Sequence, residues 1–306
     1  MSFALLAEQI LNGLQFGVML FLMSAGLTLI FGVMGLINLA HGSFYMVGAF
    51  ACAAVAAVTG SFWLGLLASL AGAAAAGALV EIAIVRRLYQ RDHLDQVLAT
   101  FALILVFSEG TRWLFGSFPL YLTIPPLLEG AATLPGGLQY PVYRLAVIGL
   151  GIAIALGLYV LISRTRLGMR IRAGEDDREM IAALGVDIGR LNTIVFALGA
   201  ALAGLAGATV GALQSVQVGM GEPVLILAFV VIVIGGIGSV RGALFGAILV
   251  GLVDTAGRFL LPRAAGLFVP PADAALVGSG LASMAIYVVM AVILAFRPKG
   301  LFAIHA

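Results

Sequence analysis

Three polar residues interrupt an apolar stretch in the first part of the chain. Asn38, His41 and Ser43 lie in residues 31–50, FGVMGLINLAHGSFYMVGAF, where glycines also weaken any helix. A broken helix frees backbone groups, which a membrane tolerates only where protein or a water-filled cavity meets them. Such breaks are typical of substrate passages in transporters. The stretch therefore predicts either a broken helix at a translocation path, or an ordinary turn between two helices in which Ser43 caps the second.

A second group of candidate residues lies in the charged loop 164–192. The pattern over 175–184 predicts a short surface helix, with acidic residues in its first turn and a glycine just after its last. Its small apolar face needs a surface to pack against, either a partner protein or the chain's own helices. The candidates for contact with a partner are Glu179, Met180, Ile181, Leu184 and Gly185.

Charged residues also fall within or near the apolar stretches. Glu109 and Arg112 are three residues apart, so the two can meet on one helix face. Asp254 and Arg258, four apart, can do the same, and Glu81 stands alone. Charges inside a membrane are candidates for function. Because all of these lie near the ends of predicted helices, where pairing and snorkelling make them tolerable, we favour a structural role.

The motifs of common enzyme classes are absent from the sequence. There is no G-x-x-x-x-G-K-[ST] loop, and the only lysine, Lys299, lies outside any glycine-rich loop, so the chain cannot by itself be a P-loop ATPase. Neither a G-x-S-x-G elbow nor a zinc-binding helix is found. Cys52 is the single cysteine, and the three histidines are scattered. We therefore expect no catalytic residues, no cofactor and no metal, and a net charge of +2 gives no reason to expect nucleic acid.

Composition decides which elements hold these residues. Of the 306 residues, 62% are hydrophobic and only 10% are charged, whereas a soluble domain has roughly 25% charged residues. Lipid is the natural solvent for such a chain, and the long apolar runs argue against a barrel of alternating strands. The sequence predicts an all-α transmembrane bundle of about 8–10 spans, forming a single domain over 1–306. The candidate spans are 7–31, 41–59, 62–86, 94–115, 143–163, 193–214, 223–238, 242–261 and 279–296.

The basic residues orient the predicted spans. Twelve of the 16 arginines and lysines collect on one side, including all of those in the 164–192 loop. Because cytoplasmic loops are enriched in arginine and lysine, we expect this loop and the C-terminus in the cytoplasm, and the N-terminus outside if nine segments cross. Residues 116–142, with their prolines and glycines, then form the longest external loop.

Small residues recur at helical spacing. They occupy every fourth position over 199–211, and again Gly242 and Gly246. Small residues at this spacing let helices approach closely in lipid, so close packing is the expected role. A weaker pattern aligns GLINLAHG at 35–42 with GGIGSVRG at 235–242, an indication of an internal repeat.

Four segments, in order along the chain, carry a family resemblance. They are SAGLTLIFGVMGLINLAHGSFYMVGAF at 24–50, MIAALGVDIGRLNTIVFALGAALAGLAG at 180–207, GGIGSVRGALFGAILVGL at 235–252 and RPKGLF at 297–302. Together they resemble the branched-chain amino acid ABC permease family, and within it the LivH type. The resemblance covers nearly the whole chain.

The resemblance implies a bacterial inner-membrane importer in which two permease subunits line the path, this chain with a LivM-type partner or with another copy. It also implies two cytoplasmic ATPase subunits and a periplasmic substrate-binding protein. By position, the 175–184 helix would be the coupling helix that contacts an ATPase. The chain lacks the Glu-Ala-Ala triplet of importer loops and has only Ala182-Ala183, so the resemblance does not assign the side chain that enters the ATPase groove.

The predicted function is thus a transport subunit and not an enzyme: the membrane-spanning part of an ATP-driven importer of branched-chain or related amino acids. The resemblance leaves urea, amides and aromatic acids as alternative substrates. A self-sufficient, ion-coupled secondary transporter or channel is the alternative from another class. We disfavour it because no acidic residue lies at the centre of a predicted span to carry a proton.

Overall fold

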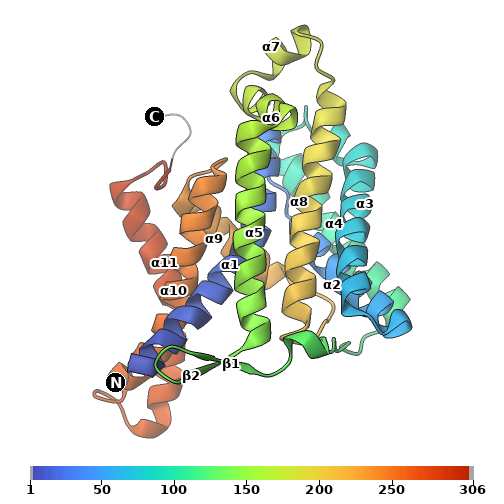
Figure 1. Ribbon diagram of the computed structural model, residues 1–306. Helices are drawn as coiled ribbons and strands as arrows, with labels where there is room; N and C mark the ends of the chain where they lie inside the picture. The colour runs from blue at the N-terminus through green and yellow to red at the C-terminus, as the bar shows by residue number, and fades with distance from the viewer. Residues whose placement is uncertain (1–2, 303–306) are drawn as a thin grey trace. The chain divides into compact units, whose positions relative to one another are not determined.

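The computed structural model describes residues 3–302, and these are overwhelmingly helical (Figure 1). Eight helices in this part of the chain are long and apolar enough to cross a membrane. A ninth apolar helix, α9, has only 15 residues. All nine predicted spans are therefore confirmed as helices, namely α1 (Phe3–Met34), α2 (His41–Thr59), α3 (Phe62–Ala83), α4 (His93–Phe115), α5 (Val142–Arg164), α8 (Ile188–Gly211), α9 (Gly221–Gly235), α10 (Val240–Ala265) and α11 (Pro271–Phe296).

The helices begin and end where local groups satisfy the free ends of the backbone. The Ser61 Oγ accepts a hydrogen bond from the Leu64 N–H at the start of α3, and the Ser239 Oγ accepts one from the Gly242 N–H at the start of α10. α2 ends at Gly60, whose φ of 67° is left-handed and favours glycine. These caps explain why the long apolar runs divide into separate helices where they do.

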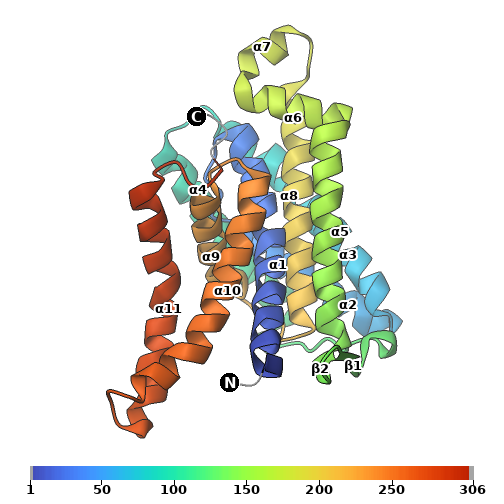
Figure 2. The same ribbon diagram turned by 60° about the vertical axis from the view of Figure 1, so that its left-hand side comes forward.

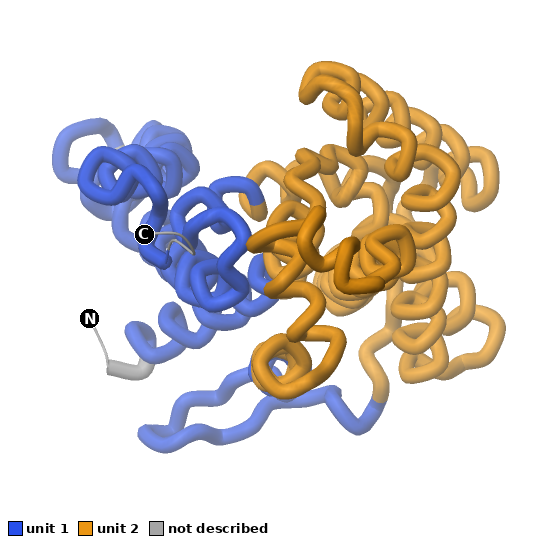
Figure 3. Tube along the Cα trace, turned by 90° about the horizontal axis from the view of Figure 1, so that it is seen from above, with its two compact units in different colours: residues 1–21, 126–152, 229–306 blue, residues 22–125, 153–228 orange. Residues whose placement is uncertain are grey.

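The chain forms two compact units (Figure 3). One comprises the described parts of residues 1–21, 126–152 and 229–306, and the other comprises 22–125 and 153–228. In the first unit, α10 and α11 lie side by side (Figure 2). In the second, α2, α3 and α8 pack against one another.

Glycine allows the closest of these helix contacts. A Cβ added at Gly48 of α2 would stand 2.6 Å from the carbonyl oxygen of Gly204 in α8, closer than real Cβ atoms come to a neighbour. Gly199 of α8 meets Gly26 of α1 in the same way, and Gly246 of α10 lies against the carbonyl of Val231 in α9. The predicted packing role of these regularly spaced small residues is confirmed.

The 116–142 loop contains a small β-hairpin that the sequence did not lead us to expect. β1 (Ala131–Leu134) pairs antiparallel with β2 (Leu138–Pro141), after a 3₁₀ turn at Pro126–Leu128. Gly136 has a φ of 88°, as the third position of the turn 134–137 requires, in which Pro135 takes the second position. The Tyr140 hydroxyl and the Arg144 guanidinium both donate to Asn12 Oδ1 of α1, so the hairpin is tied to that helix.

Candidate translocation path and docking segment

The predicted break between α1 and α2 is present. α1 ends at Met34, and α2 begins only at His41. Gly35 takes a φ of 62°, and its N–H still bonds the Phe31 carbonyl, so the helix closes at a left-handed glycine. The Asn38 Oδ1 then accepts a hydrogen bond from the Ala40 N–H at 3.0 Å, which turns the chain into α2.

Each of the three polar residues predicted at this break is buried. Asn38 and His41 have no exposed surface, and Ser43 is 4% exposed. His41 Nε2 lies 3.2 Å from the Met23 carbonyl oxygen. Within the described part of the chain, the Asn38 Nδ2, the His41 Nδ1 and the Ser43 Oγ have no hydrogen-bond partner. Such orphaned polar atoms are costly in an apolar interior, so they form a set of groups able to bind a polar solute or water.

One part of the alternative interpretation, that Ser43 caps α2, is wrong. α2 begins at His41, its N-cap residue is Ala40, and no side chain caps it. Ser43 is the third residue of the helix, three positions beyond the N-cap, so its hydroxyl cannot cap the first free N–H groups. Its side chain is available for another role.

The start of α2 packs against three other segments of the same unit. A Cβ at Gly42 would lie 2.9 Å from the Gly221 carbonyl oxygen, so the beginnings of α2 and α9 approach closely. Phe44 makes edge-to-face contacts with Phe107 of α4 and Phe196 of α8, with ring centroids 5.6 and 5.7 Å apart. Aromatic rings therefore hold one side of the break, while glycines bring the backbones of α2 and α9 together on another.

The predicted single helix over 175–184 is wrong in extent. Two helices occupy this part of the loop, α6 (Arg166–Asp176) and α7 (Arg178–Ala183). Asp177 between them is extended, with φ −149° and ψ 105°, and its Oδ1 accepts from the Met180 N–H at 2.9 Å. An aspartate that caps a new helix cannot also continue the old one. We call residues 166–185 the docking segment.

The apolar face predicted for this helix is partly buried against the chain and partly exposed. Ile181 is 6% exposed and packs near Gly174 and Leu191 of the chain itself. Met180 and Leu184 are 58% and 77% exposed. Gly185 has a φ of 85° and ends the helix as predicted. The exposed side of α7, which Glu179 also shares, is free for a partner.

Two titratable groups of the docking segment are shifted by burial. The pKa of Glu175, in the last turn of α6, is raised to about 7 because burial disfavours its charged form, although Arg172 opposes the shift. Burial also lowers the pKa of Arg178, the first residue of α7. The segment is therefore folded onto the chain at the junction of α6 and α7 and exposed beyond it.

The predicted charge pairs are confirmed as ion pairs on single helices, but Asp254 lies near the middle of α10 and not near its end as expected. Arg112 Nη1 lies 2.5 Å from Glu109 Oε1 in α4, and Arg258 Nε lies 2.9 Å from Asp254 Oδ2 in α10. Glu81, in contrast, has partners on other segments, which its position in the sequence did not reveal. In residues 3–302 no three histidine, cysteine or acidic side chains gather closely enough to hold a metal ion.

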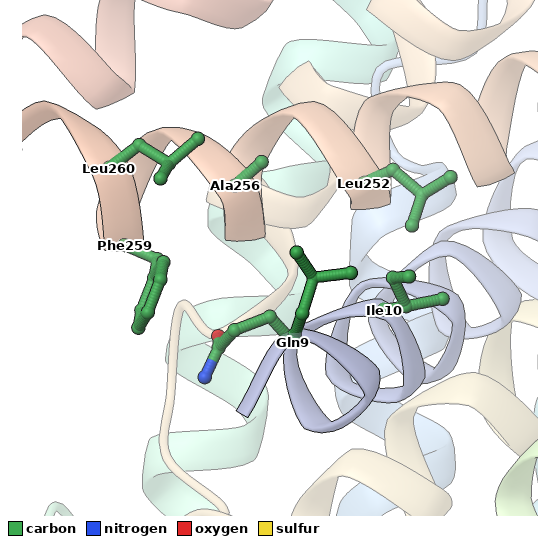
Figure 4. Close-up of a pocket in the computed structure, with 7 residues that line it drawn as sticks. Gln9, Ile10, Leu252, Ala256, Phe259 and Leu260 are labelled. Atoms are coloured by element: carbon green, nitrogen blue, oxygen red, sulfur yellow. The ribbon is translucent and has the colours of Figure 1, made fainter. Parts of the chain in front are cut away.

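A separate apolar pocket of about 180 Å³ lies between the first turns of α1 and the second half of α10 (Figure 4). Leu252, Ala256, Phe259 and Leu260 of α10 face Gln9 and two apolar residues of α1 across it, and Gln9 supplies the only polar side chain of the lining. None of the residues of the α1–α2 break takes part. Its lining suits hydrocarbon better than a polar solute.

A bundle of apolar spans with a broken helix and buried polar groups defines a polytopic membrane protein of the permease class. The sequence matches the model of the family described as "Branched-chain amino acid transport system / permease component" over residues 9–296, and the chain belongs to this family.

Its relatives include the high-affinity branched-chain amino acid permease protein BraD of Pseudomonas aeruginosa, which is 30% identical over 82% of this chain and 85% of its own. LivH of Escherichia coli K12 is 28% identical over 83% of this chain and 86% of its own. LivH of Salmonella typhimurium is 27% identical over the same shares of the two chains. No solved structure matches the chain.

Proposed function

We propose that this chain is the membrane-spanning permease subunit of an ATP-driven importer of branched-chain or related amino acids. The observation that carries the proposal is the buried polar break between α1 and α2, in a chain whose relatives are named as branched-chain amino acid permeases. Three unpaired polar groups beside a helix break suit the ammonium and carboxylate of an amino acid, while the surrounding aromatic rings suit an apolar side chain.

In this proposal Asn38, His41 and Ser43 line the translocation path. The exposed side of α7 contacts one of two ATPase subunits, and a second permease subunit, of the LivM type or another copy, completes the path. A periplasmic binding protein delivers the solute. The chain lies in the bacterial inner membrane with the docking segment and the C-terminus in the cytoplasm, which the distribution of arginines supports.

We expect the purified chain alone, reconstituted in liposomes, to accumulate no leucine under a proton or sodium gradient. The chain has no phosphate loop to hydrolyse ATP, and Asp254, an acidic residue near the middle of α10, is ion-paired with Arg258 and so is not a free proton carrier. Radiolabelled uptake is measured with and without the ATPase subunits, the second permease subunit, the binding protein and ATP. Accumulation that needs none of them would favour a secondary transporter; no accumulation with all of them would contradict the import of leucine.

The path is tested by cysteine labelling in a Cys52→Ala background. Asn38→Cys and His41→Cys should react with a water-soluble maleimide in at least one transport state, because their neighbours' unpaired polar groups favour water. Ala49→Cys, fully buried in α2, should stay inert, and Met180→Cys, exposed on α7 in the chain alone, should react when the ATPase is absent. If Asn38→Cys and His41→Cys remain as inert as Ala49→Cys with and without nucleotide, the break is a packed turn and not a path.

A further inference from the structure

Glu81 is a buried carboxylate near the C-terminal end of α3, with no exposed surface. Three side chains hydrogen-bond it. The Thr193 hydroxyl donates to Oε2 at 2.6 Å, and the Tyr89 hydroxyl donates to Oε1 at 3.0 Å. Arg86 donates through Nη2 to Oε2 at 3.0 Å and through Nε to Oε1 at 3.3 Å. The carboxylate is thus held on both oxygens.

The partners of Glu81 come from different parts of the chain. Arg86 and Tyr89 belong to the turn after α3, whereas Thr193 lies in the second turn of α8. Arg86 Nη2 also donates to the Thr193 Oγ1 at 2.8 Å, which fastens this turn to α8 a second time. The Tyr89 hydroxyl lies 3.5 Å from the Sδ of Met34, the last residue of α1. The carboxylate therefore joins α3 to α8 directly and reaches the end of α1 through the contact of Tyr89 with Met34.

The docking segment rests on the same place. A Cβ at Gly174 of α6 would contact Ile181 of α7, Leu191 of α8 and Val33 of α1 at 3.4–4.0 Å, so the four helices meet here. The Nη2 of Arg178 lies 3.6 Å from the position of a Cβ at Gly35, where the break begins. Burial raises the pKa of Tyr89 and lowers that of Arg178, as expected where both are packed at this junction.

We propose that Glu81 is a positioning residue that couples the docking segment to the α1–α2 break. It holds the start of α8, on which α7 rests, against the end of α1, so that a displacement of α7 moves the break instead of being absorbed in the loop. The inference rests on the proposed function of the docking segment. Burying a carboxylate costs free energy, and α1 and α8 already touch through their glycines without it. Because Glu81 joins several segments, removing one of its hydrogen-bond partners loosens all of them.

The test in the complete transporter compares solute transported with ATP hydrolysed. Glu81→Gln removes the charge, and Thr193→Val removes one hydroxyl at nearly constant volume. We expect the solute transported per ATP to fall about tenfold in both variants, with hydrolysis retained, because Glu81→Gln sets an amide N–H against one of the donors and Thr193→Val leaves Oε2 with Arg86 as its remaining donor. Thr193→Ser should restore the ratio. Thr100→Val is the control, since the Thr100 hydroxyl bonds the Gln96 and Val97 carbonyls of its own helix. A wild-type ratio in Glu81→Gln and Thr193→Val would overturn the inference.

A second measurement needs no partner and separates this inference from the proposed function. Amide hydrogen exchange is followed in the purified chain over residues 31–41 and 186–193. Both segments should exchange about tenfold faster in Glu81→Gln and Thr193→Val, and at the wild-type rate in Thr193→Ser and Thr100→Val. If only 186–193 exchanges faster, Glu81 anchors α8 alone and the inference fails. A wild-type complex that does not transport would contradict the proposed function and leave this result standing.

Discussion

Gly48→Val should leave almost no folded protein. The Cβ of valine would stand 2.6 Å from the carbonyl carbon and oxygen of Gly204, and backbone atoms cannot swing aside as a side chain can. α2 and α8 would have to separate, which also strains the hydrogen bond from the Ser69 hydroxyl to the Gly204 carbonyl. Overpacking a tight contact destabilises the folded state by about 1–3 kcal/mol. Because backbone atoms surround this site on both sides, we expect a cost at or above the upper end of that range. The readout is the monodisperse yield and thermal midpoint in detergent.

Gly110→Val and Gly157→Val are matched controls. Both glycines lie inside long helices, α4 and α5, and a Cβ at either would meet nothing within 4 Å. Valine has a better helix propensity than glycine, so these variants should keep the wild-type yield. If Gly48→Val folds as well as the two controls, α2 and α8 are not in direct backbone contact.

Leu184→Asp and Met180→Asp should each release the ATPase from the purified complex. Both side chains are exposed on α7 in the chain alone, and burying one of them in a partner is worth roughly 1.5–3 kcal/mol, or about 10–150-fold in affinity. An aspartate in their place would also be desolvated at the contact. Pulldown of the ATPase at equal recovery of the permease measures the effect.

Two further variants make the result specific. Ile181→Asp should reduce the recovery of the folded permease itself, because Ile181 is buried against the chain. Leu94→Asp alters a residue that is 68% exposed beside the turn after α3, and it should leave ATPase recovery unchanged. Loss of the ATPase in Leu94→Asp, with retention in Leu184→Asp and Met180→Asp, would move the docking site to the 86–93 turn.

The spans and the break could be predicted because local sequence determines both. About 20 apolar residues suffice to make a span wherever they occur. The break is local for the same reason: Gly35 supplies a left-handed residue, and the Asn38 side chain bonds an amide two positions ahead. The division of the docking segment into two helices is also determined locally. However, any of the three consecutive acidic residues 175–177 could cap a new helix, and the sequence does not say which of them ends the first helix.

The Glu81 cluster could not be predicted, because its partners are distant in sequence. Thr193 is 112 residues from Glu81, and no periodicity connects them. The contact between Gly48 and Gly204 has the same character, since each glycine is unremarkable in its own helix. The split of Met180 and Ile181 into an exposed and a buried residue also depends on where α1 ends and where α8 begins.

The shortness of α9 has a consequence for biosynthesis. Its 15 residues extend about 22 Å, whereas the hydrocarbon core of a bilayer is about 30 Å thick. If α9 left the translocon by itself, its polar flanking residues would be drawn into the hydrocarbon core. Gly242 and Gly246 at the start of α10 lie directly against the second half of α9, so the two helices form a tight hairpin. We therefore expect α9 to be retained in the translocon until α10 has been synthesised, and the two helices to enter the bilayer together.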